Sequence, residues 1–136
     1  MPLGRLTYLY AGSADVEKDI AYWTKTVGAD LVWDFEGFGT RVAAVRPWKE
    51  GPLLLLAGHR PTPTMLPCFA VDDLDASEKD LKQKGWHAEG GRFGLPDGTA
   101  IMFKDPSGNE FVIYGDERPR ALEHEFARGG GVHEHA

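Results

Sequence analysis

The sequence carries an internal repeat, and this repeat restricts the folds open to the chain. Residues 15–28 and 73–85 each begin with aspartate, continue for about three helical turns and end at glycine. Apolar residues of the first segment recur at the spacing of one helical face, at Val16, Ile20, Trp23 and Val27. In the second segment this stripe is thinner, and Asp75 followed by Glu78 has the spacing of a capping box. The repeat predicts one amphipathic helix in each half of the chain.

Short β-type runs surround each predicted helix in the same order. One run precedes the first helix and three follow it, at residues 6–11, 31–35, 40–45 and 53–57. The second helix is framed in the same way by residues 66–71, 87–92, 99–104 and 110–114. Glycine- and proline-rich breaks separate the runs, as is typical of loops and hairpins. The pattern is therefore β-α-β-β-β, written twice.

This pattern gives a domain organisation. We expect a first βαβββ module over residues 1–58, a linker over 59–64, a second βαβββ module over 65–115 and a tail over 116–136. A further short helix is predicted within the tail, over residues 119–128, because Leu122 and Phe126 are four residues apart and Gly129 would end it. Its apolar pair needs a cover, either the partner subunit of a homodimer or the same chain.

A sheet covered on one face by one helix leaves its other face bare. Two such units can solve this by placing their bare faces opposite each other. The expected fold class is therefore α+β, with two βαβββ modules whose curved mixed sheets enclose a cleft.

Composition excludes several classes of protein. The chain has 136 residues, 42% of them hydrophobic, which suits a compact domain and not a disordered segment. Its net charge is −6 and its Lys and Arg residues are scattered, so nucleic acid is not an expected partner. No apolar run is long enough to cross a bilayer. The apolar stretch near the N-terminus is shorter than the apolar core of a secretory signal, so we expect a cytoplasmic protein. The single cysteine, Cys68, excludes an intrachain disulfide and a cysteine-rich zinc site.

Three motifs resemble those of the vicinal oxygen chelate superfamily. They are Asp15-Val-Glu-Lys-Asp-Ile-Ala-Tyr-Trp23 with Val27-Gly28, Phe69-Ala-Val-Asp-Asp-Leu-Asp75, and Phe103-Lys-Asp-Pro-Ser-Gly-Asn109. Each motif is weakly specific, but together, in this order and spacing, they cover roughly residues 3–115. The superfamily includes glyoxalase I, extradiol dioxygenases, fosfomycin-resistance enzymes and bleomycin-resistance proteins. The resemblance implies the glyoxalase-like fold described above.

The resemblance also implies a divalent metal, which superfamily enzymes bind with His or Gln in the first strand, Glu in the fourth, His in the fifth and Glu in the eighth. Counting from the motifs places these positions at Leu6 or Tyr8, at Leu66 and at Val112, while the fourth strand offers Leu53, Leu54, Leu55 and Leu56. Such side chains cannot replace N and O ligands. We therefore expect no metal cofactor. A displaced ligand at His59 is the alternative, whereas His87, His124, His133 and His135 are read as exposed or tail residues.

Without a metal, the expected cleft becomes an apolar pocket with a few polar groups, which suits a small organic molecule. We choose the residues that line this pocket from strand alternation and from closeness to the expected opening of the cleft. They are Tyr8, Tyr10, Trp33, Phe35, Trp48, Leu66, Cys68, Glu110, Val112 and Tyr114, and Phe38 also lies near the expected opening. Any one aromatic residue on a strand is more often core than ligand contact. Tyr8 and Tyr10 are the strongest candidates, because an ordinary core would bury both hydroxyls. Cys68 is most simply a small buried hydrophobe.

Charged residues on the predicted strands offer contacts for a charged ligand. Arg41 and Arg46 could pair with an acid, and Asp34 and Glu110 with a cation. Solvent-exposed strand faces explain the arginines equally well. The net charge of −6 slightly favours a basic ligand.

Three functions follow from this reading. The first is a metal-independent, small-molecule-binding protein that resembles the drug-sequestering, bleomycin-resistance branch and holds its ligand in an aromatic cleft. The second is a lyase or dioxygenase-type enzyme of the same superfamily, with an unrecognised metal or none. The third is a non-catalytic dimerisation or regulatory domain. The residues favour binding over catalysis, because no acid, base or nucleophile can be named, and they predict a homodimer only through the resemblance.

Overall fold

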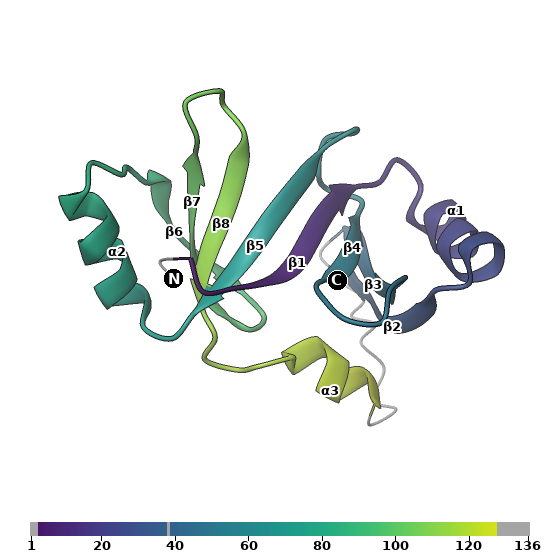
Figure 1. Ribbon diagram of the computed structural model, residues 1–136. Helices are drawn as coiled ribbons and strands as arrows, with labels where there is room; N and C mark the ends of the chain where they lie inside the picture. The colour runs from purple at the N-terminus through teal and green to yellow at the C-terminus, as the bar shows by residue number, and fades with distance from the viewer. Residues whose placement is uncertain (1–2, 38, 128–136) are drawn as a thin grey trace. The chain divides into compact units, whose positions relative to one another are not determined.

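The computed structural model describes residues 3–37 and 39–127, and the chain divides into two compact units (Figure 1). We call the first unit Tyr8–Met65 together with the segment that starts at Arg120, and the second unit Met1–Thr7 together with Leu66–Pro119. Phe38, His133 and His135, which the sequence analysis considered, lie outside the described residues.

The first unit is a four-stranded sheet with three helical segments. Its elements are β1 (Arg5–Gly12, which begins in the second unit), α1 (Val16–Ala21), the π-helix η1 (Tyr22–Val27), β2 (Asp30–Gly37), β3 (Thr40–Arg46), β4 (Leu53–Ala57) and α3 (Ala121–Ala127). The strands hydrogen-bond in the order β2-β3-β4-β1. β1 pairs parallel with β4, and the other two pairs are antiparallel.

The second unit repeats this arrangement. Its elements are β5 (Met65–Val71), α2 (Leu74–Gln83), β6 (Glu89–Leu95), β7 (Gly98–Lys104) and β8 (Glu110–Gly115). The order is β5-β8-β7-β6, again with the first strand parallel to the last. The predicted α+β class with two βαβββ modules is confirmed. No helix among the described residues is long and apolar enough to cross a membrane.

Aspartate side chains start the two repeat helices. The Asp15 carboxylate accepts a hydrogen bond from the Lys18 backbone N–H, and Asp73 accepts from Ala76 in the same way. The suggested capping box of Asp75 and Glu78 is wrong. Both carboxylates bind Arg92 of β6 instead, at 2.6 and 2.8 Å, because Asp73 already caps the helix.

Two further elements differ from the sequence prediction. The first helix changes at Tyr22 from α- to π-type hydrogen bonding before it ends at Gly28, whose φ of 90° suits glycine. The sixth strand starts at Glu89 instead of 87, because the chain first turns at Gly85 to place Trp86 against Phe103, with ring centroids 5.4 Å apart.

Helices cover both faces of the sheet in the first unit. On one face, Ile20 and Trp23 pack against a buried cluster that includes Val45, Leu54 and Leu56. On the opposite face, Leu122 and Phe126 of α3 pack against a second cluster. In the second unit, α2 and the residues after it cover the face formed by Val71, Ile101, Phe103 and Ile113.

An ion pair joins β2 and β3 within the first unit. The Arg41 guanidinium donates to both carboxylate oxygens of Asp34, at 3.1 and 2.8 Å. Asp34 is 9% exposed, and the hydrogen bond to Asp34 raises the pKa of Arg41 above its usual value. Two of the four residues considered as contacts for a charged ligand, Asp34 and Arg41, therefore bind each other.

This pair gives a stability prediction. Asp34→Asn should lower the free energy of unfolding by about 2 kcal/mol, since it removes a charge-assisted bidentate bond and leaves a half-buried guanidinium poorly paired. Glu36→Gln is the control, because its carboxylate is exposed and lies 4.0 Å from the Arg41 Nε atom. It should change stability by less than about 0.5 kcal/mol. Equal effects of the two substitutions in urea unfolding would contradict this account.

Candidate functional site

Four of the predicted lining residues meet on one sheet face of the first unit. Tyr8, Tyr10 and Phe35 pack against a buried core that contains Trp33. We call these four residues the aromatic cluster. The other buried residues of that core are Val42, Ala44, Leu53, Leu55 and Ala57.

Strand register explains this convergence. In the parallel β1–β4 pair, Tyr8 lies beside Leu53 and Tyr10 beside Leu55, so these four side chains share a face. The intervening Leu9 and Ala11 point to the other face, under α1 and η1. The face chosen from the sequence is therefore opposite α1, and Tyr8 and Tyr10 are only half-buried there.

The buried core that contains Trp33 is also in contact with α3. Leu122 and Phe126, both half-buried, pack against this core, as Tyr8, Tyr10 and Phe35 do, and the Glu123 carboxylate lies 3.7 Å from the Arg46 guanidinium of β3. The tail helix therefore packs on its own chain, which is one of the two covers considered from the sequence. Apolar spacing predicted an amphipathic helix here, but no signal in the sequence identified the surface on which it would lie.

A polar group lies at the edge of the aromatic cluster. The Tyr10 hydroxyl is 3.5 Å from His59 Nε2, the two rings meet edge to face, and His59 Nδ1 is 3.3 Å from the Thr40 hydroxyl. Desolvation, and to a lesser extent the charge of Arg60, lower the pKa of His59 below its usual value. A neutral imidazole can donate at one nitrogen and accept at the other. Sequence reasoning considered His59 only as a metal ligand and did not name Thr40.

Trp48 lies outside the aromatic cluster. It belongs to the β3–β4 loop, where its indole N–H donates to the Pro52 carbonyl at 2.6 Å. The side chain is 37% exposed. Its observed hydrogen bond therefore joins two residues of the β3–β4 loop.

The remaining candidates belong to the second unit. Leu66 and Cys68 of β5 and Val112 and Tyr114 of β8 are all at most 5% exposed, and Glu110 is half-buried. The parallel register places Cys68 beside Val112, on the face opposite α2. The structure thus gathers these residues on one face of their own unit.

Tyr114 has a hydrogen-bond partner within the second unit. Its hydroxyl lies 2.7 Å from the Thr7 hydroxyl, and burial raises its pKa above the usual range. A buried tyrosine is stabilised when its hydroxyl is paired in this way. This contact accounts for a buried hydroxyl at a position that the sequence analysis assigned to ligand binding.

The side chains at the positions expected for metal ligands do not fit a divalent cation. Leu66, Val112 and the leucines of β4 have no donor atom, and Tyr8 lies among aromatic and aliphatic neighbours. Among residues 3–37 and 39–127, no three His, Cys, Asp or Glu side chains lie close enough together to hold a metal ion.

A surface hollow of about 480 Å³ lies elsewhere on the second unit, at the start of α2. It is lined by Gly4, Arg5, Ala70, Val71, Asp72, Asp73, Ala76 and Ser77. None of these is among the ten predicted lining residues. The lining of this hollow has no aromatic side chain, so it offers no flat surface to a planar ligand.

Solved structures of methylmalonyl-CoA epimerases show the same fold. Methylmalonyl-CoA epimerase from Mycobacterium tuberculosis is 17% identical, with a TM-score of 0.67 over 82% of this chain and 87% of that chain. A variant of the Streptomyces coelicolor methylmalonyl-CoA epimerase in complex with 2-nitronate-propionyl-CoA is 15% identical, with a TM-score of 0.66 over 88% and 98%. TnmS3, an antibiotic binding protein from Streptomyces sp. CB03234, is 27% identical over 85% and 98%, with a TM-score of 0.41.

Comparison with the curated proteins gave no match. A family model described as Glyoxalase/Bleomycin resistance protein/Dioxygenase superfamily matches residues 5–113, which is most of the chain. The chain belongs to the glyoxalase/bleomycin resistance protein/dioxygenase superfamily.

Proposed function

We propose that this protein is a metal-independent binding protein that sequesters a planar aromatic organic molecule on the aromatic cluster of its first unit. The observation that carries the proposal is the convergence of Tyr8, Tyr10, Trp33 and Phe35 on one sheet face. Aromatic rings offer large, flat and rigid contact surfaces to a planar ligand.

The edge of the aromatic cluster supports recognition of a polar substituent. Tyr10, His59 and Thr40 bring two hydroxyls and an imidazole together, and their mutual contacts of 3.3–3.5 Å are long for hydrogen bonds. A ligand group with a donor or an acceptor can replace these weak contacts with shorter ones. The preferred ligand is therefore planar, with a hydrogen-bonding group on its edge.

The donor set supports a function without a metal. The superfamily positions of β4, β5 and β8 carry leucine and valine, and these aliphatic side chains favour an organic ligand over an ion. Sequestration needs no chemical step, because a protein present in sufficient amount lowers the free concentration of a molecule by binding it. Affinity alone then determines function.

The contribution of the tyrosines can be tested with a matched aromatic control. Tyr8→Ala and Tyr10→Ala should each weaken binding of a planar aromatic ligand about tenfold, since each removes a ring of the cluster. Tyr22→Ala removes a tyrosine that is 53% exposed on η1, and it should leave affinity unchanged. Ligands would come from a fluorescence screen of aromatic compounds, with affinities measured by titration calorimetry. If all variants bound the ligand with equal affinity, the aromatic cluster would not be the binding site.

Metal independence has its own test. Native mass spectrometry of tag-free protein, purified from its own host, should show no stoichiometric metal, and the same spectrum reports any co-purified organic molecule. Treatment with EDTA should leave ligand affinity unchanged. One metal ion per chain, or loss of binding after chelation, would instead support an enzyme.

An enzyme is the second candidate function, because His59 places a titratable imidazole beside the hydroxyl of Tyr10. A binding protein and an enzyme differ in what His59→Gln does. Under sequestration it changes affinity, and the ligand is recovered chemically unchanged from either protein. Turnover of the ligand by the wild type that is lost in His59→Gln would establish catalysis.

A further inference from the structure

We infer that α3 is a displaceable cover of the aromatic cluster, so that the tail helix and a planar aromatic ligand compete for one surface of the first unit. The identity of the competing ligand rests on the proposed function. The occupation of the surface by α3 does not, because in the structure itself Leu122 and Phe126 pack against the same buried core, containing Trp33, that Tyr8, Tyr10 and Phe35 contact.

The first argument is the small size of the helix. Within the described residues α3 has seven residues, about two turns, and a helical segment of this length is marginal in water without tertiary packing. Its described apolar contacts with the core that contains Trp33 come from Leu122 and Phe126, which are both only half-buried. The closed position therefore depends on a small contact area that an aromatic ligand can match.

The second argument is the carboxylate of Glu123. It lies 3.7 Å from the guanidinium groups of Arg46 and of Arg120, which is too long for a hydrogen bond. Its Oε1 atom is buried and has no hydrogen-bond donor among the described residues. An oxygen desolvated without full compensation destabilises the closed state, and opening returns it to water.

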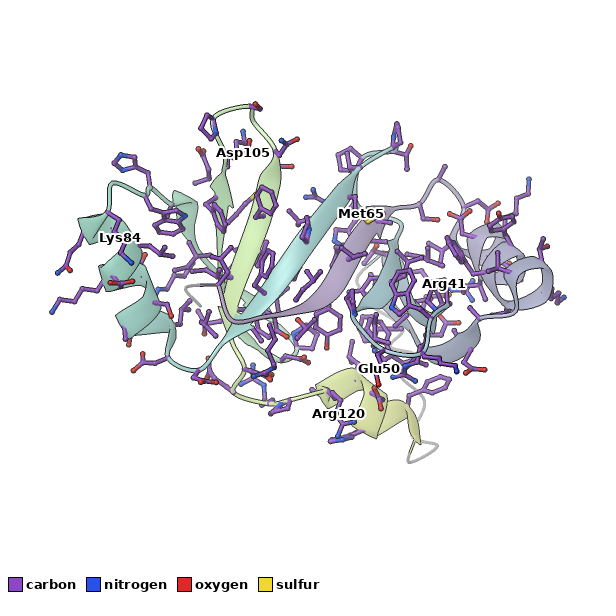
Figure 2. The ribbon with its side chains drawn as sticks, viewed as in Figure 1. Arg41, Glu50, Met65, Lys84, Asp105 and Arg120 are labelled. Carbon is purple, nitrogen blue, oxygen red and sulfur yellow. The ribbon has the colours of Figure 1, made fainter. Side chains whose placement is uncertain are left out.

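The third argument is the backbone at the start of α3. Arg120, labelled in Figure 2 where the helix begins, has a φ of 52°, in the left-handed region that a side chain with a Cβ disfavours. Release of α3 lets this residue return to an extended or right-handed conformation. The closed state thus carries a backbone cost that the open state does not.

The residues just before Arg120 are held within the second unit. Asp116 binds Arg5 at 3.2 Å, Glu117 accepts from the Thr99 backbone N–H at 3.1 Å, and the Arg118 Nε–H donates to the Pro96 carbonyl at 2.9 Å. The second unit therefore keeps its contacts when α3 leaves. The hinge is confined to residues 119 and 120.

The cover reduces the apparent affinity of the cluster. A ligand that binds only the uncovered state has its affinity lowered by the fraction of molecules in which α3 is displaced. Substitutions that weaken the closed state should tighten binding, and substitutions that favour it should weaken binding. General destabilisation does not readily explain opposite effects of one change within α3 and one change at the residue that precedes it.

The test uses the full chain and the dye 8-anilinonaphthalene-1-sulfonate as a planar aromatic probe. Phe126→Ala should tighten dye binding about five- to tenfold, because it removes one of the two apolar contacts of α3. Arg120→Gly should weaken it about fivefold, because glycine adopts a positive φ without strain and favours the closed state, and this gain outweighs the loss of the exposed 3.7 Å contact with Glu123. His124→Ala, at an exposed position of the same helix, is the control and should match the wild type. Near-ultraviolet circular dichroism checks that each variant keeps its tertiary packing.

The two proposals fail in different ways. If Phe126→Ala and Arg120→Gly bind the dye as the wild type does, or shift affinity in the same direction, the cover is overturned while binding by the aromatic cluster stands. If Phe126→Ala, with its cluster uncovered, binds no dye, the proposed binding function is overturned.

Hydrogen exchange tests the cover without a ligand. The amides of residues 124–127 should exchange through a local opening faster than those of β1 and β4, and exchange of all of them only through global unfolding would overturn the cover.

Discussion

The parallel register of β1 with β4 is the constraint on which the rest of the first unit depends. Side chains alternate across a strand, so the pairing of Tyr8 with Leu53 and Tyr10 with Leu55 decides which residues meet the aromatic face and which meet α1. A slip of one residue would exchange the two sets and place the tyrosine hydroxyls under α1. The alternative packing is costly because Leu9 and Ala11 fit the surface that Ile20 and Trp23 cover. Fold and candidate site are thus specified by the same register.

The two units share a topology but differ in the sheet face that lies opposite the repeat helix, α1 or α2. In the first unit α1 and α3 cover opposite faces, so the aromatic cluster lies beneath a helix supplied by the end of the described chain. In the second unit Leu66, Cys68, Val112 and Tyr114 are buried on the face opposite α2, and the Tyr114 hydroxyl is paired with Thr7. Leu66 and Val112, two of the positions expected to carry metal ligands, lie on this packed face and are at most 5% exposed. Their aliphatic side chains contribute packing and offer no donor atom.

Local signals predicted the fold well. Aspartate caps at Asp15 and Asp73, glycines after the helices and the β-type runs are short-range features, and they determined both modules and their order. The π-type turn at Tyr22 and the late start of β6 were missed. No short-range pattern in the sequence encodes the first, and the second accompanies the packing of Trp86 against Phe103. The face of Tyr8 and Tyr10 followed from alternation alone. The surface under α3, the loop contact of Trp48 and the His59–Thr40 contact each join residues whose proximity no short-range pattern encodes.

The burial of Cys68 has a consequence for the chemistry of the whole chain. Its thiol is 2% exposed and is the only one in the sequence, so oxidants and alkylating reagents reach it only when the second unit opens. A folded population therefore resists the disulfide-linked aggregation that an exposed single thiol would permit. The rate at which a thiol reagent labels the protein therefore measures how often the second unit opens. Mass spectrometry follows this labelling without a further probe. The burial of this one side chain thus limits disulfide-linked aggregation and makes thiol labelling a measure of the folded state of the second unit.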